Sequence, residues 1–327
     1  MILVAGSANL DFVVRAPHIP APGETVLGSD FRTFAGGKGA NQAVACARAG
    51  GVATSMLLAL GADSFAQPIE ASLIAAGVKL HVHRTENMPT GTAFICVSDS
   101  AENAITVAPG ANSALRAEHL PDLTGMSHLL MQLETPLETV AACAEAARKA
   151  GVAVLLNAAP AQALPLDLLA YVDVLVVNEG ELASISNCTG SVAECLDLMP
   201  DVPCIVVTLG GQGCCARFSG EAGGRIILQT AFAVAPIDTT AAGDTFCGVL
   251  VASLAQQQSL PHALERASAA AALACTRAGA QDSIPTSSEV DAFLSAQPSD
   301  PSKNVAAKAA LANYAGFQTL PDLISDF

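Results

Sequence analysis

An alternation of short apolar runs with helical stretches is the feature that most narrows the fold of this chain. Apolar runs of strand length occur at 2–5, 53–60, 128–132, 152–157, 173–177 and 204–208. Stretches with helical spacing lie between them, for example at 39–50, 65–76, 137–150 and 179–187. This order predicts an α/β fold with a mainly parallel sheet covered on both faces. Ligands bind such sheets at the carboxyl ends of the strands, where Asp11, Glu134, Asn178 and Thr208 are expected to converge.

Two stretches depart from this alternation, because they are strand-like without intervening helices. They cover residues 12–35 and 90–110. Within the second, runs at 90–98 and 104–108 flank a polar turn, which predicts a β-hairpin. A small additional sheet is therefore expected beside the main one.

Composition excludes several classes of partner. The 327 residues are 51% hydrophobic and 14% charged, enough for a large core in one large domain or two smaller ones. A net charge of −15 argues against nucleic acid and anionic membranes as partners, because phosphate contacts need a basic face. We also expect no membrane span, because no apolar run reaches about 18 residues free of charges and turn signals.

The cysteines and histidines give no metal signature. The ten cysteines have no zinc spacing and no secretion signal precedes them, which predicts a reducing, cytoplasmic location. Cys214 and Cys215 are adjacent and are expected on opposite faces of a strand. His81 and His83 are interpreted as a surface pair on a strand rather than as metal ligands.

The segment 238–246, Asp-Thr-Thr-Ala-Ala-Gly-Asp-Thr-Phe, carries the strongest chemical signal. It lies between an apolar stretch at 232–237, expected to be a strand, and a helix expected to begin near Gly243. Small residues ahead of a helix leave its first N–H groups uncovered, and these groups attract anions together with the helix dipole. Asp244 would then take the proton from a hydroxyl that attacks a phosphoryl group. The alternative interpretation is an ordinary helix start with an acidic residue in its first turn.

A second glycine-rich segment, 36–42, precedes the helical stretch at 39–50. It reads Gly-Gly-Lys-Gly-Ala-Asn-Gln. Its glycines allow the backbone to approach a ligand closely, and Lys38 and Asn41 offer polar contacts. It is not a Walker A loop, because Gly39 and Ala40 follow Lys38 where Ser or Thr would be required.

Together the two segments resemble the paired signatures of the ribokinase-like (phosphofructokinase-B) carbohydrate kinases. Further stretches that support the resemblance lie at 6–11, 22–25, 131–136 and 178–181. The likeness covers about residues 1–296 and implies a three-layer αβα sandwich. It also implies a small β-sheet lid built from 12–35 and 90–110, through which two copies would pair as a homodimer. The remaining residues 297–327 form an extension.

The resemblance also implies an activity: the transfer of phosphate from ATP to the primary hydroxyl of a pentose, with D-ribose favoured. It further implies roles for individual residues. The base and anion hole would be Ala241, Ala242, Gly243 and Asp244, and the sugar contacts Asn9, Asp11, Gly37, Lys38, Gly39, Asn41 and Glu134. Contacts to ATP would come from Asn178, Thr208, Gly210, Gly211, Gly213, Gly243 and Ser268, with Glu181 organising Mg²⁺. Ser268 stands where members of the family can carry a His against the adenine. A K⁺ site would involve Asp238, Thr240, Ala274, Arg277, Gly279 and Ser283, mostly through backbone carbonyls.

Alternatives stay open at this point. The same chemistry could act on another sugar or a nucleoside, including 2-keto-3-deoxygluconate, fructose, a fructose phosphate or adenosine. The chain could also be a sugar-binding regulator without catalysis. In the extension, Pro298 and Pro301 are expected to form a linker, followed by a helix around 305–314 that docks on its own subunit or on a neighbour.

Overall fold

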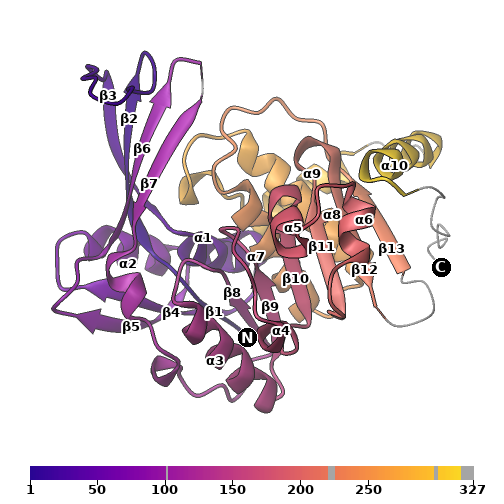
Figure 1. Ribbon diagram of the computed structural model, residues 1–327, viewed down its shortest axis with the longest axis horizontal. Coiled ribbons are helices and arrows are strands. Elements are labelled where there is room, and N and C mark those ends of the chain that lie inside the picture. Colours follow the sequence, from indigo (N-terminus) through magenta and orange to yellow (C-terminus); the bar gives the residue numbers. More distant parts are fainter. Residues whose placement is uncertain (101, 220–224, 298–300, 318–327) are drawn as a thin grey trace.

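The main body of the protein is a nine-stranded sheet between two layers of helices (Figure 1). The computed structural model describes the chain except residues 101, 220–224, 298–300 and 318–327. The strand order is β13-β12-β11-β10-β9-β8-β1-β4-β5. The strands are β1 (Ile2–Ala5), β4 (Thr54–Gly61), β5 (Lys79–Thr85), β8 (His128–Met131), β9 (Ala153–Asn157), β10 (Val174–Asn178), β11 (Cys204–Thr208), β12 (Gly213–Phe218) and β13 (Arg225–Thr230). All neighbours from β5 to β11 pair in parallel, and only β12 and β13 add antiparallel pairs at one edge.

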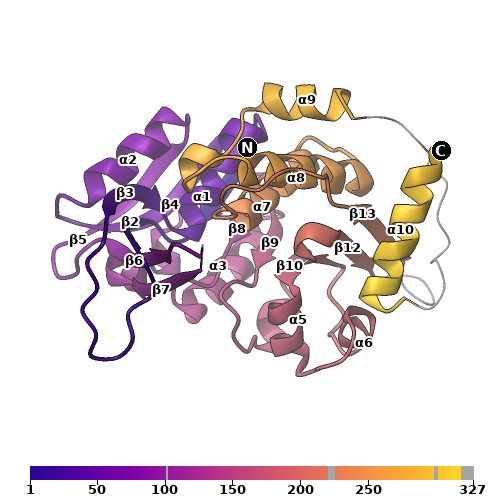
Figure 2. The same ribbon diagram turned by 90° about the horizontal axis from the view of Figure 1, so that it is seen from above.

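Helices cover both faces, as the alternation predicts (Figure 2). One layer holds α1 (Lys38–Val44) with its π-helical continuation Ala45–Ala49, α2 (Ala66–Ala75), α7 (Ala242–Ala255), α8 (Leu260–Cys275) and α9 (Ser287–Ser295). The other holds α3 (Leu137–Lys149), α4 (Leu166–Leu169), α5 (Glu179–Ser186), α6 (Val192–Asp197) and α10 (Pro301–Ala315). Side chains alternate between these two cores along each strand. Cys214 and Cys215 accordingly lie in opposite cores, which confirms the prediction for this pair.

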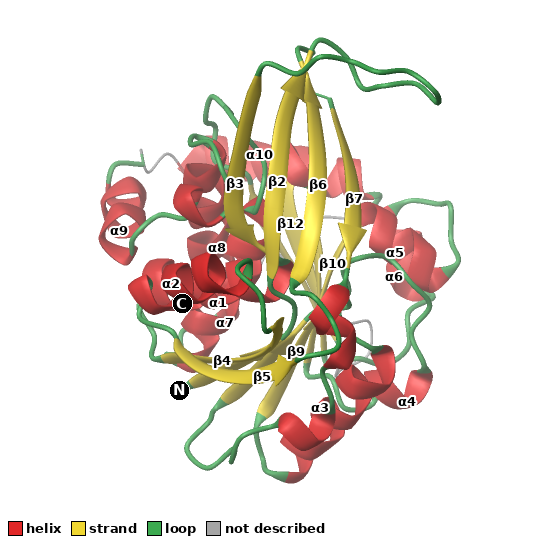
Figure 3. Cartoon of the chain, turned by 90° about the vertical axis from the view of Figure 1, so that its left-hand side faces the viewer, coloured by secondary structure: helices red, strands yellow, loops and turns green. Residues whose placement is uncertain are grey.

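A four-stranded sheet rises from one edge of this body (Figures 1 and 3). Its order is β3-β2-β6-β7, with β2 at Asn9–Ala16, β3 at Asp30–Gly36, β6 at Gly91–Ser98 and β7 at Asn103–Ala108. The predicted hairpin is confirmed as the antiparallel pair β6–β7. The predicted strand-like stretch 12–35 is in fact two strands joined by a long irregular connection.

The expected strand at 232–237 is wrong. The strand is the preceding segment β13, and residues 231–237 have no regular secondary structure. Pro236 lacks the N–H that a sheet ladder needs. The next two N–H groups, of Ile237 and Asp238, instead both donate to the carbonyl oxygen of Cys275. The segment therefore turns away from the sheet toward the end of α8.

The C-terminal extension contains helix α10, which packs on its own chain. Leu311, Ala312 and Ala315 are buried in the core beneath it, and Tyr314 Oη donates to Glu179 Oε1 at 3.0 Å. Pro301 begins this helix and does not belong to a linker, because proline fits the first helical turn. Pro298 lies outside the described residues. No helix in the described part of the chain is both long and apolar enough to cross a membrane.

Candidate active site

The predicted site residues come from one edge of the main sheet. Strands β1, β8, β9, β10 and β11 are parallel neighbours, so their carboxyl ends lie at the same edge. Glu134, Asn178 and Thr208 stand at or just after these ends, whereas Asp11, which was expected with them, lies within β2 of the small sheet. The base of the four-stranded sheet meets this edge, because β2 begins at Asn9 directly after β1.

The glycine-rich loop is held against the segment that follows β1. Gly37 is the N-cap of α1 with φ of 88°, and a Cβ there would lie 2.8 Å from Asn9 N. A Cβ on Gly39 would lie 2.6 Å from Ser7 N. Only glycine fits at either position, so the loop brings the start of α1 to the end of β1.

Lys38 lies among carboxylates at this place. Glu134 Oε2 accepts hydrogen bonds from Ser7 Oγ at 2.6 Å and from the backbone N–H of Lys38 at 3.1 Å. Burial lowers the pKa of Lys38, but the carboxylates of Asp244, Glu134 and Glu181 outweigh this effect and raise the pKa above its usual value. The ammonium group is therefore held in its charged form among these acids.

Asp11 is the most perturbed of these acids. Burial, followed by the charges of Glu134 and Asp244, raises its pKa to about 7. Its Oδ1 is buried and has no hydrogen-bond partner within the described chain, and the same is true of Asn41 Oδ1. Buried acceptors without donors favour a ligand rich in hydroxyl groups at this position.

Asp244 is the centre of the arrangement. Asn41 Nδ2 donates to its Oδ2 and Gln42 Nε2 donates to its Oδ1, both at 2.9 Å. Asp244 is 8% exposed, so its carboxylate is almost fully removed from solvent. Gln42 belongs to the glycine-rich segment but was given no role from the sequence. Its position next to Asn41 was the only signal available.

The first turn of α7 presents free N–H groups beside this carboxylate. The helix begins at Ala242, and its N-cap Ala241 has a left-handed φ of 58°. Ala241 O accepts from both Thr245 N and Thr245 Oγ1 at 2.8 Å, which fixes the turn. The N–H groups of Gly243 and Asp244 meet no acceptor among the described residues, and a Cβ on Gly243 would meet nothing within 4 Å. This open helix start is suited to an anion.

Asn178 and Glu181 form a capping box at the start of α5. Asn178 Oδ1 accepts from Glu181 N, and Glu181 Oε2 accepts from Asn178 N, each at 2.8 Å. Burial raises the pKa of Glu181, although the Asn178 N–H and the charge of Lys38 partly offset it. The capping box thus holds the Glu181 carboxylate where it interacts with the charge of Lys38.

Of the residues expected to contact ATP, those in the turn after β11 lie near the surface, whereas Ser268 lies in the core. Gly210 and Gly211 are exposed in the turn between β11 and β12, which Leu209 N closes by donating to Gly213 O at 2.8 Å. Thr208 Oγ1 donates back to Val177 O. Ser268 is instead buried in α8, with its hydroxyl 3.9 Å from Cys214 Sγ. The expected contact of Ser268 with the adenine stays a prediction.

Three of the expected K⁺ residues, Asp238, Thr240 and Gly279, are joined by hydrogen bonds. Asp238 accepts hydrogen bonds from the backbone N–H groups of Thr240 at 2.9 Å and Gly279 at 3.0 Å. Burial raises the pKa of Asp238, but these bonds and that of the Thr240 hydroxyl outweigh it and lower the pKa. The guanidinium of Arg277 turns to Glu289 at 2.6 Å. Of the remaining two, the carbonyl of Ala274 accepts from Arg277 N and the Ser283 hydroxyl donates to Ala280 O.

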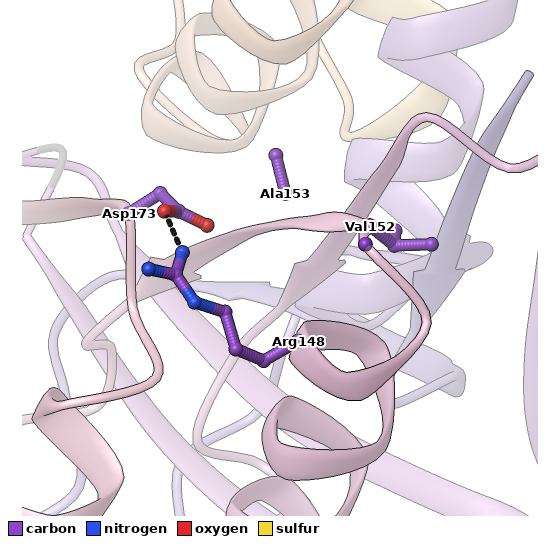
Figure 4. Close-up of a pocket in the computed structure, with 5 residues that line it drawn as sticks. Arg148, Val152, Ala153 and Asp173 are labelled. Atoms are coloured by element: carbon purple, nitrogen blue, oxygen red, sulfur yellow. Dashed lines mark hydrogen bonds and ion pairs between the residues drawn. The ribbon is translucent and has the colours of Figure 1, made fainter.

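A separate pocket of about 230 Å³ (Figure 4) lies at the opposite edge of the main sheet. Val152, Ala153 and Asp173 line it at the amino ends of β9 and β10, and Arg148 pairs with Asp173 across it. Because the cluster around Asp244 lies at the carboxyl ends, this pocket is not part of the site. The described residues include no group of three or more His, Cys, Asp or Glu side chains arranged to hold a metal.

The fold and this site define the class of the protein. Residues 1–287 match the pfkB family of carbohydrate kinases, and the chain belongs to this family. It is 38% identical over 304 residues to the ribokinase of Haemophilus influenzae, covering 90% of this chain and 98% of that one. It is 39% identical over 309 residues to the ribokinase of Schizosaccharomyces pombe, with 89% and 96% covered. The structure of Arabidopsis thaliana ribokinase complexed with ribose and ATP superposes with a TM-score of 0.81 at 32% identity, covering 90% of this chain and 99% of that one.

Proposed function

We propose that this carbohydrate kinase transfers the γ-phosphoryl group of ATP to the primary hydroxyl of D-ribose, forming ribose 5-phosphate. The observation that carries the proposal is the Asp244 carboxylate, held by two side-chain amides directly beside the uncovered N–H groups of the α7 start. Similarity to ribokinases over about 90% of the chain, one of them solved with ribose and ATP, supports the choice of substrate.

In this mechanism Asp244 accepts the proton of the attacking hydroxyl. The N–H groups of Gly243 and Asp244 bind the oxygens of the transferring phosphoryl group, whereas the Ala242 N–H already donates to Thr239 O. The sugar hydroxyls are held by Asn9, Asp11, Asn41 and Glu134. These hydroxyls donate to the buried Oδ1 atoms of Asp11 and Asn41, which have no donor within the described chain. Gly37, Lys38 and Gly39 close the loop over the sugar, and the lid excludes water that would otherwise accept the phosphoryl group.

Mg²⁺ and K⁺ are part of the proposal. Glu181, a buried acid close to Lys38, would organise the magnesium ion, which offsets the charge of the nucleotide phosphates when bound. Asp238 keeps its negative charge, since its pKa is lowered, and its Oδ2 accepts only the hydrogen bond from Gly279 N, which leaves that oxygen a second lone pair. It therefore fits a neighbouring K⁺ that shapes the α7 start. Asn178, Thr208 and the glycines of the 210–213 turn would contact the nucleotide.

We also propose that the lid pairs two copies of the chain. Phe12 stacks between Phe94 at 5.3 Å and Phe31 at 6.2 Å, and these rings line an apolar cavity of about 450 Å³ on the lid. Phe94, Ile105 and Phe31 are more than half exposed, which is unusual for side chains of this kind. Phe94→Asp would turn a dimer into monomers in sedimentation velocity, and a wild-type monomer at micromolar concentration would contradict the pairing.

Two further features remain proposals: the division into a kinase domain, 1–296, and an extension, 297–327, and a cytoplasmic location. All ten cysteines are free, and most are buried, which suits a reducing compartment. An acidic surface is consistent with small-molecule partners rather than nucleic acid or membrane.

The test of function is ATP consumption by the purified protein with Mg²⁺ and K⁺ on a panel of acceptors. The panel holds ribose, deoxyribose, fructose, fructose 6-phosphate, 2-keto-3-deoxygluconate and adenosine. Turnover on ribose at least tenfold above the others is expected. Preferred turnover on another acceptor would move the substrate, and binding of ATP and sugar without any turnover would favour the regulator.

A further inference from the structure

Gln42 is a fully buried amide in contact with Asp244. Its side chain is 0% exposed. The two hydrogens of its Nε2 are both used, one by Asp244 Oδ1 at 2.9 Å and one by Asn157 Oδ1 at 3.0 Å. Its Oε1 accepts from Gln132 Nε2 at 2.6 Å. Every polar atom of the amide therefore has a partner.

These partners allow only one orientation of the Gln42 amide. Turned around, Oε1 would face the oxygens of Asp244 and Asn157, and three acceptors would meet without a hydrogen. The direction of Asn157 is fixed in turn, because its Nδ2 donates to the backbone carbonyl of Val176 at 3.3 Å. Gln132 lies against Gly6, where a Cβ would come within 2.0 Å of Gln132 Oε1. The amide chain is thus anchored to the ends of β8, β9 and β10.

Close helix packing sets the distance between Gln42 and Asp244. A Cβ on Gly248, one turn beyond Asp244, would lie 2.5 Å from Ala45 Cβ and 2.7 Å from Gln42 O. Cys46 Sγ, one turn beyond Gln42, donates to Gly248 O at 3.3 Å. Helices α1 and α7 therefore touch at backbone distance in the turn after the two side chains.

We propose that Gln42, oriented by Gln132 and Asn157, is the positioning residue that fixes the direction of the Asp244 carboxylate toward the acceptor hydroxyl. This inference rests on the proposed role of Asp244 as the base. Asn41 holds the other oxygen but also borders the sugar, whereas Gln42 is fully buried and acts only through Asp244. A base that is free to rotate loses the alignment that proton transfer requires.

The test is Gln42→Met, which keeps the length of the side chain and removes both donors. We expect kcat to fall roughly 10- to 100-fold, as for loss of a hydrogen bond to a charged group, with KM for sugar and ATP within about threefold. Thr139→Val is the control, because Thr139 Oγ1 donates to Leu115 O in a buried bond of α3 on the opposite face of the sheet. It should lower the melting temperature but leave kcat unchanged.

A double-mutant cycle separates positioning from general packing. Gln132→Met alone should lower kcat less than Gln42→Met, since the bond to Asp244 can still form. In the Gln42→Met background the same change should have no further effect on kcat, because Gln132 acts only through Gln42. Independent, multiplicative losses would overturn the inference, as would an unchanged kcat in Gln42→Met.

Crystal structures of the wild type and of Gln42→Met give a readout that needs no substrate. The Asp244 carboxylate should be rotated or spread over more than one conformer in the variant. A carboxylate in the same single orientation would refute the positioning role, whatever the protein phosphorylates. Absence of turnover by the wild type on every acceptor would instead refute the proposed function.

Discussion

Asn41 Nδ2 lies 2.9 Å from Asp244 Oδ2 although 203 positions separate the two residues in the chain. Each stands in the first turns of its own helix, and the two helices pack side by side on one face of the sheet. The two sequence signatures are therefore one structural unit. Changes to either helix should affect the same carboxylate.

Replacing the carboxylate itself gives the most direct prediction. Asp244→Asn keeps the size of the side chain but removes the base, so kcat should fall by roughly 10²–10⁴-fold. Affinity for ATP, measured by calorimetry, should change by only a few fold, because the N–H groups of the α7 start remain. Near-normal turnover would remove Asp244 from the role of base.

Gly248→Ala should disturb the site without touching it. Its Cβ would overlap Ala45 and force α7 away from α1, at a cost of about 1–3 kcal/mol in unfolding free energy. We expect kcat to fall as well, because the amides of Asn41 and Gln42 then no longer reach Asp244. Gly50→Ala is a matched control, since its Cβ would overlap Ala252 Cβ at 2.2 Å at the far end of the same helix pair. Equal losses of kcat in both variants would show that only overall stability matters.

The buried Asp11 predicts a pH dependence of stability. Its pKa is about 7 in the folded protein, against 3.8 for an Asp side chain free in water, so the folded state binds more protons between these pH values. Stability therefore decreases as pH rises from about 4 to 7. Asp11→Asn removes this loss and should stabilise the ligand-free protein at pH 8 by on the order of 4 kcal/mol, with little gain at pH 4. Urea unfolding at both pH values tests it, and a gain independent of pH would contradict the burial argument.

The same substitution should weaken sugar binding. Asp11 Oδ1 is a buried acceptor without a donor in the described chain, and a sugar hydroxyl would supply one. The substitution replaces one of the two acceptor oxygens with an amide donor and removes the charge, so hydrogen bonds from sugar hydroxyls become fewer and weaker. Calorimetric titration with ribose should show affinity at least tenfold lower in Asp11→Asn, while ATP affinity is retained. Unchanged ribose affinity would place the sugar elsewhere.

Helix α10 should contribute to stability although it lies beyond the region shared with the family. Leu311 is 2% exposed in the core beneath the helix, so Leu311→Ala should cost about 2–4 kcal/mol in unfolding free energy. Val305→Ala on the same helix, at 53% exposure, should stay within about 0.5 kcal/mol of the wild type. The urea concentrations at the unfolding midpoints of the two variants test this difference. Equal midpoints for both variants would show that α10 does not dock in solution.

Local sequence patterns were enough to predict the layer architecture and the chemistry of the loops. Buried parallel strands must be apolar and the helices between them amphipathic, so periodicity alone placed most elements within one or two residues. Local backbone geometry requires the glycines at 37 and 39 and the small residues before Asp244. These residues can therefore be recognised from the sequence without knowledge of the fold. The strand expected at 232–237 was misplaced. An apolar run in the sequence does not indicate that Pro236 and the hydrogen bonds to the Cys275 carbonyl turn the chain away from the sheet.

The surroundings of Asp244 depend on contacts between distant parts of the chain. Gln42, Gln132 and Asn157 are ordinary polar residues in the sequence, and their hydrogen bonds join four separate elements. The raised pKa of Asp11 likewise depends on burial and on charges from distant parts of the chain. Such interactions act through space at a few ångströms, whereas periodicity reports only which face of an element is buried. The sequence could therefore identify Asp244 as the candidate base, whereas the direction in which its carboxylate is held follows from the packing of α1 against α7.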